Sequence, residues 1–324
     1  MATARSWRRG TDVTGPFPIG LEDVRALNEV FSDAFTDRYR RDGLVGVRVP
    51  MLNPAVWRYA IEDADGGAML WRDERGDIAA FNVAHVSGAE GWMGPLAVRP
   101  DSQGAGIGKR VVQAGIDFVR SRGARVIGLE TMPRTLDNIG FYSTLGFVPG
   151  RLTLTLTLDA GAADRAPVLY GRLHEREKRP VREACAALVQ SMVPGYDYTR
   201  EIELTDALAL GDTVLLMRDR AVTGFAICHS VPLVEGRTRE ELRVLKLVLA
   251  RESDLDEMLR ALGDVARRSG TRRVAVRVQG EYEGAYRRLV ALGGRVRWSD
   301  LRMSLVDHQE RMPRSGVVIS NWEI

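Results

Sequence analysis

The chain of 324 residues contains few of the residues on which disulfide and metal chemistry depends. It has two cysteines, Cys185 and Cys228, and four histidines that are scattered along the sequence. Two cysteines are too few for a disulfide framework or a cysteine-based zinc site, and the histidines lack the spacing of metal ligands. Both cysteines lie in apolar stretches, where a free cysteine behaves as a small buried hydrophobe. We therefore expect no metal centre.

Long apolar runs are also absent. No stretch of 18 apolar residues occurs, which predicts that no transmembrane helix forms. Residues 1–10 carry charge but lack the apolar segment of a secretory signal. The helical stretches are rich in Asp and Glu, which is not typical of a protein that lies on a membrane surface. We expect a cytoplasmic location and no membrane partner.

Lysine is scarce, with Lys109, Lys178 and Lys246 as its three occurrences, so nearly all basic residues are arginine. The formal net charge is +3, and the arginines alternate with Asp and Glu. No basic stripe with interleaved aromatic residues is present, which argues against a nucleic-acid partner. A monomer or a homodimer is expected.

One glycine-rich stretch lies between a predicted strand and a predicted helix. The apolar residues 92–98 predict the strand, and Lys109 to Arg122 has the spacing of an amphipathic helix. Between them, Gly104, Gly106 and Gly108 allow a tight turn and close approach of a ligand to the backbone. The first-turn amides of a helix have no intrahelical partner and attract anions. The stretch therefore predicts an anion cradle, which suits phosphate. It has neither the Walker A spacing nor the dinucleotide-binding glycine pattern.

Residues 96–108, Leu-Ala-Val-Arg-Pro-Asp-Ser-Gln-Gly-Ala-Gly-Ile-Gly, resemble the pyrophosphate-binding signature of the GNAT superfamily of acyl-CoA N-acyltransferases. Residues 138–147 resemble the second motif block of that family, in which a helix carries a tyrosine, here Tyr142, four residues before Gly-Phe. The resemblance implies direct transfer of an acyl group from acyl-CoA, usually acetyl-CoA, to an amine. The acceptor, an unidentified small amine or peptide, is left open.

The resemblance also implies which residues contact the cofactor. Backbone N–H groups at Leu96 and Val98 would polarise the thioester carbonyl. The family often places Asn seven residues before the tyrosine, where this chain has Thr135, with Asn138 one turn later. Either residue is a candidate for the pantetheine amide. The expected cofactor-binding residues are Leu96, Val98, Gln103, Gly104, Ala105, Gly106, Ile107, Gly108, Lys109, Thr135, Asn138 and Tyr142.

Two catalytic residues are expected. Tyr142 is the candidate general acid, because a tyrosine with a pKa near 10 is protonated at neutral pH and can donate to the leaving thiolate. The candidate general base is Glu130, on the strand across the expected gap. Some relatives carry a glutamate where this chain has Pro95. Glu62 and His85 are weaker alternatives for the base.

The pattern of strands and helices occurs twice. In the first half, two helices precede three strands, a helix, a strand, a helix and final strands, which resembles the GNAT order. In the second half, a helix over residues 175–192 precedes the same succession. Residues 159–167 are small and polar, as in a linker. We expect an α+β (mixed α/β) fold with two tandem GNAT-like domains, residues 1–160 and 161–324. Each is predicted as a mixed, mostly antiparallel splayed sheet flanked by helices.

An internal alignment at an offset of 147 residues supports a duplication, since residues 117–123 match residues 264–270 and Leu145-Gly146 match Leu292-Gly293. At this offset the glycine turn falls on residues 251–255, which contain no glycine, and Tyr142 falls on Leu289. Three carboxylates, Glu252, Asp254 and Asp256, lie at the start of the helix predicted there. We therefore predict a degenerate second domain and one acetyl-CoA site in residues 1–160. The alternative is a non-catalytic acyl-CoA-binding module with a regulatory or interaction role.

Overall fold

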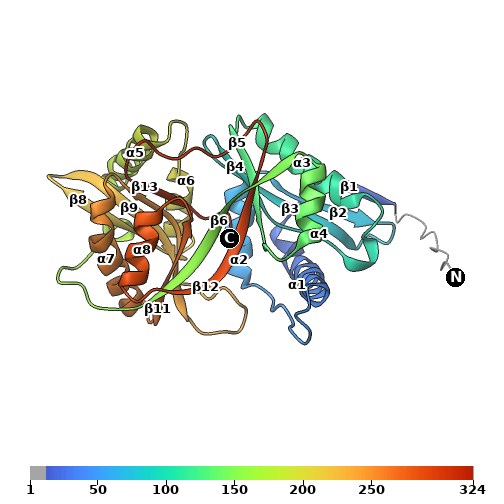
Figure 1. The fold of residues 1–324 in the computed structure, drawn as a ribbon, viewed down its shortest axis with the longest axis horizontal. Helices are drawn as coiled ribbons and strands as arrows, with labels where there is room; N and C mark the ends of the chain where they lie inside the picture. Colours follow the sequence, from blue (N-terminus) through green and yellow to red (C-terminus); the bar gives the residue numbers. More distant parts are fainter. Residues whose placement is uncertain (1–11, 324) are drawn as a thin grey trace.

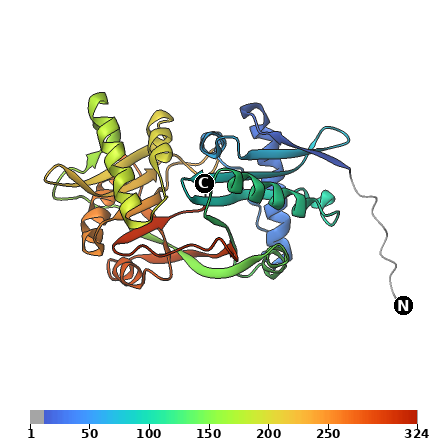
Figure 2. The same cartoon turned by 90° about the horizontal axis from the view of Figure 1, so that it is seen from above.

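The computed structural model describes residues 12–323 (Figures 1 and 2). Residues 1–10, on which the expectation of no secretory signal rests, lie outside this range. The first half contains β1 (Val13–Pro18), η1 (Leu21–Asp23), α1 (Val24–Arg41), α2 (Pro54–Ala64), β2 (Ala68–Asp73), β3 (Ile78–Ser87), β4 (Glu90–Val98), η2 (Pro100–Ser102), α3 (Ile107–Ser121), β5 (Val126–Thr131), α4 (Leu136–Thr144) and β6 (Phe147–Asp159).

The second half repeats the succession of elements with the same parallel pairing at its centre. It contains β7 (Val168–Leu169), η3 (Tyr170–Arg172), α5 (Glu175–Met192), α6 (Thr199–Ala207), β8 (Gly211–Arg218), β9 (Ala221–His229), β10 (Glu241–Leu249), η4 (Glu252–Asp254), α7 (Leu255–Arg268), β11 (Arg273–Gln279), α8 (Glu283–Ala291), β12 (Arg295–Leu305) and β13 (Val317–Ser320). The parallel pairs are β4 with β5 and β10 with β11. The expected mixed α/β fold built from two like domains is confirmed.

The 147-residue offset holds for part of the repeat. It relates the start of β5 to the start of β11, and both ends of α4 to those of α8. The strands before them, β4 and β10, are instead 151 residues apart, because residues 99–106 connect β4 to α3 whereas the shorter segment 250–254 connects β10 to α7. The difference between the two halves is therefore concentrated at the glycine turn.

All thirteen strands of the described residues belong to one sheet, and the two halves exchange strands within it. The strand order is β1-β2-β3-β4-β5-β12-β6-β11-β10-β9-β8-β7, with β13 on β10. Strand β12 of the second half lies between β5 and β6, and β6 of the first half pairs with β11 from Asp159 to Thr153. The strands β6 and β12 run side by side at the centre of the molecule (Figure 1). Neither half thus completes its sheet alone.

Two cores cover opposite faces of the first half. Helix α3 places Val111 and Ile116 against Met93 and Ile127. On the other face, α1 and α2 contribute to a core that also includes residues of α5 and α6, so the two halves share this core across the molecule. In a third core, α7 and α8 pack against the strands of the second half, and Leu156 of β6 belongs to this core. None of the helices within residues 12–323 has both the length and the apolar character needed to cross a membrane.

Candidate active site

The sheet opens between β4 and β5. These parallel strands pair from Glu90 and Val126 to Met93 and Leu129, and their pairing ends there although β4 continues to Val98. The register of β3 with β4 also shifts between Asn82 and Ala84. Residues 94–98 therefore have no partner strand on the β5 side. The gap that the sequence predicts beside Leu96 and Val98 is present.

The glycine turn lies at the mouth of this gap. Gly104 and Gly106 have φ angles of +87° and +79°, which strongly favour glycine. Gly106 is the N-cap of α3, so the unpaired first-turn amides of a 15-residue helix follow the turn directly. Lys109 lies exposed in this first turn. Fixed N–H donors, a helix dipole and a cationic side chain together suit a phosphate group.

A cleft of about 420 Å³ joins the gap to the turn. It is lined by most of the residues predicted to bind the cofactor. These are Leu96, Val98, Gln103, Gly104, Gly106, Gly108, Lys109, Asn138 and Tyr142. Ala105 and Ile107 are not among the lining residues, and the Ile107 side chain is buried in the core under α3. The Gln103 amide donates to the Val98 carbonyl over 3.0 Å, which ties the turn to the end of β4.

Thr135 and Asn138 differ in their surroundings. Thr135 is fully buried, and its hydroxyl donates to Asp42 of the segment after α1 over 2.8 Å. Asn138 lies one turn into α4 and lines the cleft. Asn138 is therefore the better placed of the two for the pantetheine amide.

Tyr142 stands where two cavities meet. A second cavity of about 380 Å³ adjoins the cleft, and both are lined by Tyr142, Asn138 and Leu96. Tyr142 is on α4 and packs against Phe141 and Phe147. Burial raises the pKa of its hydroxyl, so the group remains protonated throughout the neutral range.

The second cavity is built from both halves of the chain. Phe31, Phe35 and Tyr39 of α1 contribute aromatic walls. The second half contributes Trp298 of β12, Trp322 and the apolar residues Leu233 and Val234. The loop that contains Leu233 and Val234 is held to the first half, since the backbone N–H of Asn53 donates to the backbone carbonyl of Leu233 over 2.9 Å.

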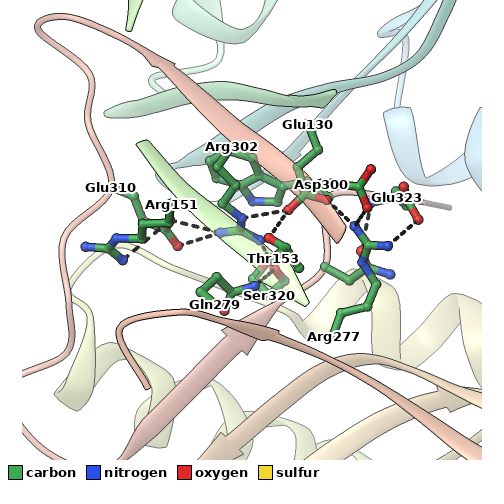
Figure 3. Close-up of polar contacts among 12 residues, drawn as sticks. Glu130, Arg151, Thr153, Arg277, Gln279, Asp300, Arg302, Glu310, Ser320 and Glu323 are labelled. Carbon is green, nitrogen blue, oxygen red and sulfur yellow. Dashed lines mark hydrogen bonds and ion pairs between the residues drawn. The ribbon is translucent and has the colours of Figure 1, made fainter. Parts of the chain in front are cut away.

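Glu130 lies in this cavity wall within an ion-pair network (Figure 3). Its carboxylate is 2.5 Å from an Arg277 nitrogen and 2.8 Å from Arg302 Nε, and it accepts a hydrogen bond from Thr153. Burial by itself raises the pKa of this carboxyl, but the two guanidinium groups outweigh it and hold the pKa at about 2. A carboxylate with such a pKa is charged and weakly basic at neutral pH. These surroundings favour a fixed anion over the proton acceptor predicted at this position.

Two further carboxylates join Glu130 at the same place. Arg277 binds Asp300 over 2.9 Å and Glu323 over 2.8 Å, and the three carboxylates lie within 4.8 Å of one another. Such a cluster could hold a cation, but the Arg277 guanidinium already lies among the three groups. Asp300 and Glu323 were not predicted, because neither belongs to a motif. Asp300 reaches the site through the pairing of β12 with β5 and β6, and Glu323 follows β13, which pairs with β10.

The weaker base candidates lie elsewhere. His85 is fully buried, has its Nδ1 2.6 Å from Asp63 Oδ2, and stacks on Trp92 with ring centroids 3.9 Å apart. Glu62 binds Arg58 on the surface of α2 over 2.7 Å. Neither residue lines the cleft or the adjoining cavity.

The start of α7 differs from that of α3. The short helix η4 precedes it, and the buried Asp254 binds Arg218 over 3.1 Å and Arg251 over 3.2 Å. Asp256 in the first turn of α7 pairs with Arg288. Carboxylates at this end of the helix stabilise it and repel a second anion. Leu289, at the offset position of Tyr142, is buried in the core.

Comparison with known proteins agrees with this geometry. The sequence profile of the acetyltransferase (GNAT) family matches residues 26–147. The chain is 32% identical over 74 residues to the [ribosomal protein bS18]-alanine N-acetyltransferase of Escherichia coli K12; the alignment covers 23% of this chain and half of that relative's length.

Two solved structures share the fold over nearly the whole chain. A candidate acetyltransferase from Pyrococcus horikoshii superposes with a TM-score of 0.67 at 14% identity, covering 99% of this chain and 98% of that one. A tandem GNAT protein from the clavulanic acid biosynthesis pathway superposes with a TM-score of 0.60 at 13% identity, covering 93% and 100%. At these identities the likeness concerns the fold.

Proposed function

Because the chain belongs to the acetyltransferase (GNAT) superfamily, we propose that it transfers an acetyl group from acetyl-CoA to the nitrogen of an amine. The observation that carries this proposal is the continuous path from the glycine turn, along the gap beside β4, to Tyr142 and the adjoining cavity. One end of the path suits a pyrophosphate and the other end offers room for an acceptor. The bS18 relative, by its name, acetylates an alanine residue.

In this proposal the cofactor lies along the cleft. The amides at the start of α3 and the Lys109 side chain bind the pyrophosphate. Asn138 contacts the pantetheine arm, and backbone N–H groups at Leu96 and Val98 stabilise the negative charge that develops on the thioester oxygen. Thr135 supports this wall indirectly through its hydrogen bond to Asp42.

Tyr142 acts as the general acid in this scheme. The attacking amine forms a C–N bond to the thioester carbon, the C–S bond breaks, and the Tyr142 hydroxyl gives its proton to the departing sulfur. A raised pKa keeps this proton available at neutral pH. Glu130, held as an anion by two arginines, contributes negative charge to the wall of the acceptor cavity.

The test measures free CoA thiol as the protein is mixed with acetyl-CoA and a panel of primary amines. We expect thiol release with at least one amine, and a fall in kcat of about 10²-fold or more for Tyr142→Phe with unchanged CoA affinity. Tyr286→Phe, which removes a hydroxyl from the corresponding helix α8, is the control and should leave kcat unchanged. CoA binding without thiol release for any amine would instead identify a non-catalytic module.

A further inference from the structure

The cavity beside Tyr142 contains a carboxylate that none of the steps above uses. Glu323 lines this cavity, and its side chain is 48% exposed. The side chains of its neighbours Glu130 and Asp300 are 2% and 4% exposed. Among the three carboxylates that share Arg277, Glu323 is therefore the most exposed to a molecule in the cavity.

Each arginine beside these carboxylates contacts more than one acidic group. Arg277 contacts all three of them, and Arg302 is shared between Glu130 and Glu310. The three carboxylates that line the cavity therefore share one guanidinium, with Arg302 adding a contact to Glu130. A bound ammonium group would lower the excess negative charge.

The rest of the cavity is apolar and aromatic. Tyr39 and Trp298 approach each other from the two halves with ring centroids 6.4 Å apart. Trp322 is fixed by the Arg302 guanidinium, 4.0 Å from its ring centroid, and by a hydrogen bond from its Nε1 to Glu90. A volume of about 380 Å³ accommodates a small molecule but not a folded protein surface.

We propose that this cavity binds a primary amine with an apolar, ring-sized body, and that Glu323 takes the proton from its ammonium group. This inference rests on the proposed acetyl transfer and names its acceptor class and its base. In the balanced step, the ammonium gives one proton to Glu323, and the neutral amine attacks the thioester carbon. The second proton of the nitrogen returns to Tyr142 after that residue has protonated the CoA sulfur. Glu323 then releases its proton to solvent.

The electrostatic surroundings of Glu323 suit this role. At the wall of the cavity, where its side chain is half-buried, desolvation raises the pKa of the Glu323 carboxyl above its usual range, with Arg277 and Arg243 opposing the shift and Asp300 and Glu130 adding to it. Tyr39 of α1 also faces the group, and burial and this carboxylate raise the pKa of the tyrosine. A base works best when its pKa lies near the working pH.

The first experiment compares Glu323→Gln with Glu310→Gln. Both substitutions remove a carboxylate paired to an arginine of the same network, but Glu310 does not line the cavity. With phenethylamine as acceptor, we expect kcat to fall about 10²-fold for Glu323→Gln at pH 7 and to remain within about twofold for Glu310→Gln. CoA affinity, measured by calorimetry, should be unchanged in both.

The pH profile separates proton transfer from simple binding. The wild-type rate should rise with pH at values above those where an ordinary carboxyl titrates, because the pKa of Glu323 is raised and this residue must be deprotonated to accept a proton. Glu323→Gln should lose this limb and follow the titration of the free amine at higher pH. Two results would overturn the assignment of the base. One is equal activity of Glu323→Gln and Glu310→Gln. The other is a Glu323→Gln variant in which only KM changes and the rate still rises with pH as in the wild type.

The acceptor class is tested with phenethylamine and phenylalanine, which differ by one carboxylate beside the amine. The three carboxylates of the cavity should repel the amino acid, so we expect kcat/KM at least tenfold higher for phenethylamine. Preference for the amino acid would overturn the acceptor class. Acetyl transfer to other amines would still stand in that case, whereas the absence of transfer to any amine would contradict the proposed function itself.

Discussion

Gly106 ends the turn before α3 with a φ of +79°, and a Cβ added there would meet no atom within 4 Å. Space would therefore permit a side chain at this position, and the backbone conformation and the expected phosphate are what disfavour it. Gly76, in the β2–β3 turn, has a φ of +84° and equally open surroundings. The two glycines form a matched pair in which one lies at the cradle and the other does not.

We predict that Gly106→Asp and Gly76→Asp each lower the free energy of unfolding by about 1–2 kcal/mol, the cost of a left-handed residue with a side chain. Gly106→Asp should in addition weaken CoA binding at least about tenfold, since its carboxylate would face the pyrophosphate. Calorimetric titration with CoA and urea unfolding measure the two effects. Equal CoA affinity in both variants would contradict the placement of the phosphate.

At the residue scale, local motifs predicted residues that the structure brings together along one cleft. Gly104, Gly106 and Tyr142 line one cleft because turn geometry and helix spacing are properties of neighbouring residues. The acceptor side is different. Asp300 reaches the cavity through the pairing of β12 with β5 and β6, and Glu323 follows β13, which pairs with β10. Glu130 acquires its low pKa from Arg277, 147 residues away. Single-residue chemistry cannot predict such neighbours.

At the scale of elements, β6 belongs to the first half of the sequence and to the core of the second half. Leu156 of this strand is fully buried among residues of β10, β11, α7 and α8. Leu152, four residues earlier on the same strand, is 43% exposed. Leu156→Ala should therefore lower the free energy of unfolding by about 2–5 kcal/mol, and Leu152→Ala by less than about 1 kcal/mol.

Urea unfolding followed by tryptophan fluorescence and by circular dichroism checks this prediction. Tryptophans occur in both halves, for example Trp57 and Trp298. Because the sheet and one core are shared, Leu156→Ala should move a single transition in both signals. If Leu156→Ala instead shifted one unfolding transition and left a second transition at its wild-type urea concentration, the two halves would unfold separately.

At the scale of the whole molecule, the chain contains two copies of one architecture but, in our proposal, a single cofactor site. The amides at the start of α3 face an open cleft, whereas Asp254 and Asp256 with their arginine partners surround the start of α7. Calorimetry on the full chain should give one CoA per chain, and Gly106→Asp should abolish this binding at the concentrations used. A stoichiometry of two would contradict the degenerate state of the second half.

The sequence predicted this duplicated architecture but not how its two copies are joined. The 147-residue offset could be predicted because matching elements such as α4 and α8 each have a local sequence pattern. The insertion of β12 between β5 and β6 is not visible in any local pattern. A boundary at residue 160 divides the repeat in sequence, while the hydrogen-bonded sheet and the acceptor cavity extend across it.

The position of β12 also sets an order of events during synthesis. About 160 residues separate the end of β5 from the start of β12, which is a delay of roughly 10–30 s at about 5–20 residues per second. During this delay the β5 edge lacks its final neighbour, although the glycine turn and α3 have already been made and Tyr142 follows shortly after β5. The cleft at the glycine turn can therefore form before the ribosome has supplied Trp298, Asp300 and Glu323, whereas the adjoining cavity, our proposed acceptor site, is complete only once β12 has entered the sheet.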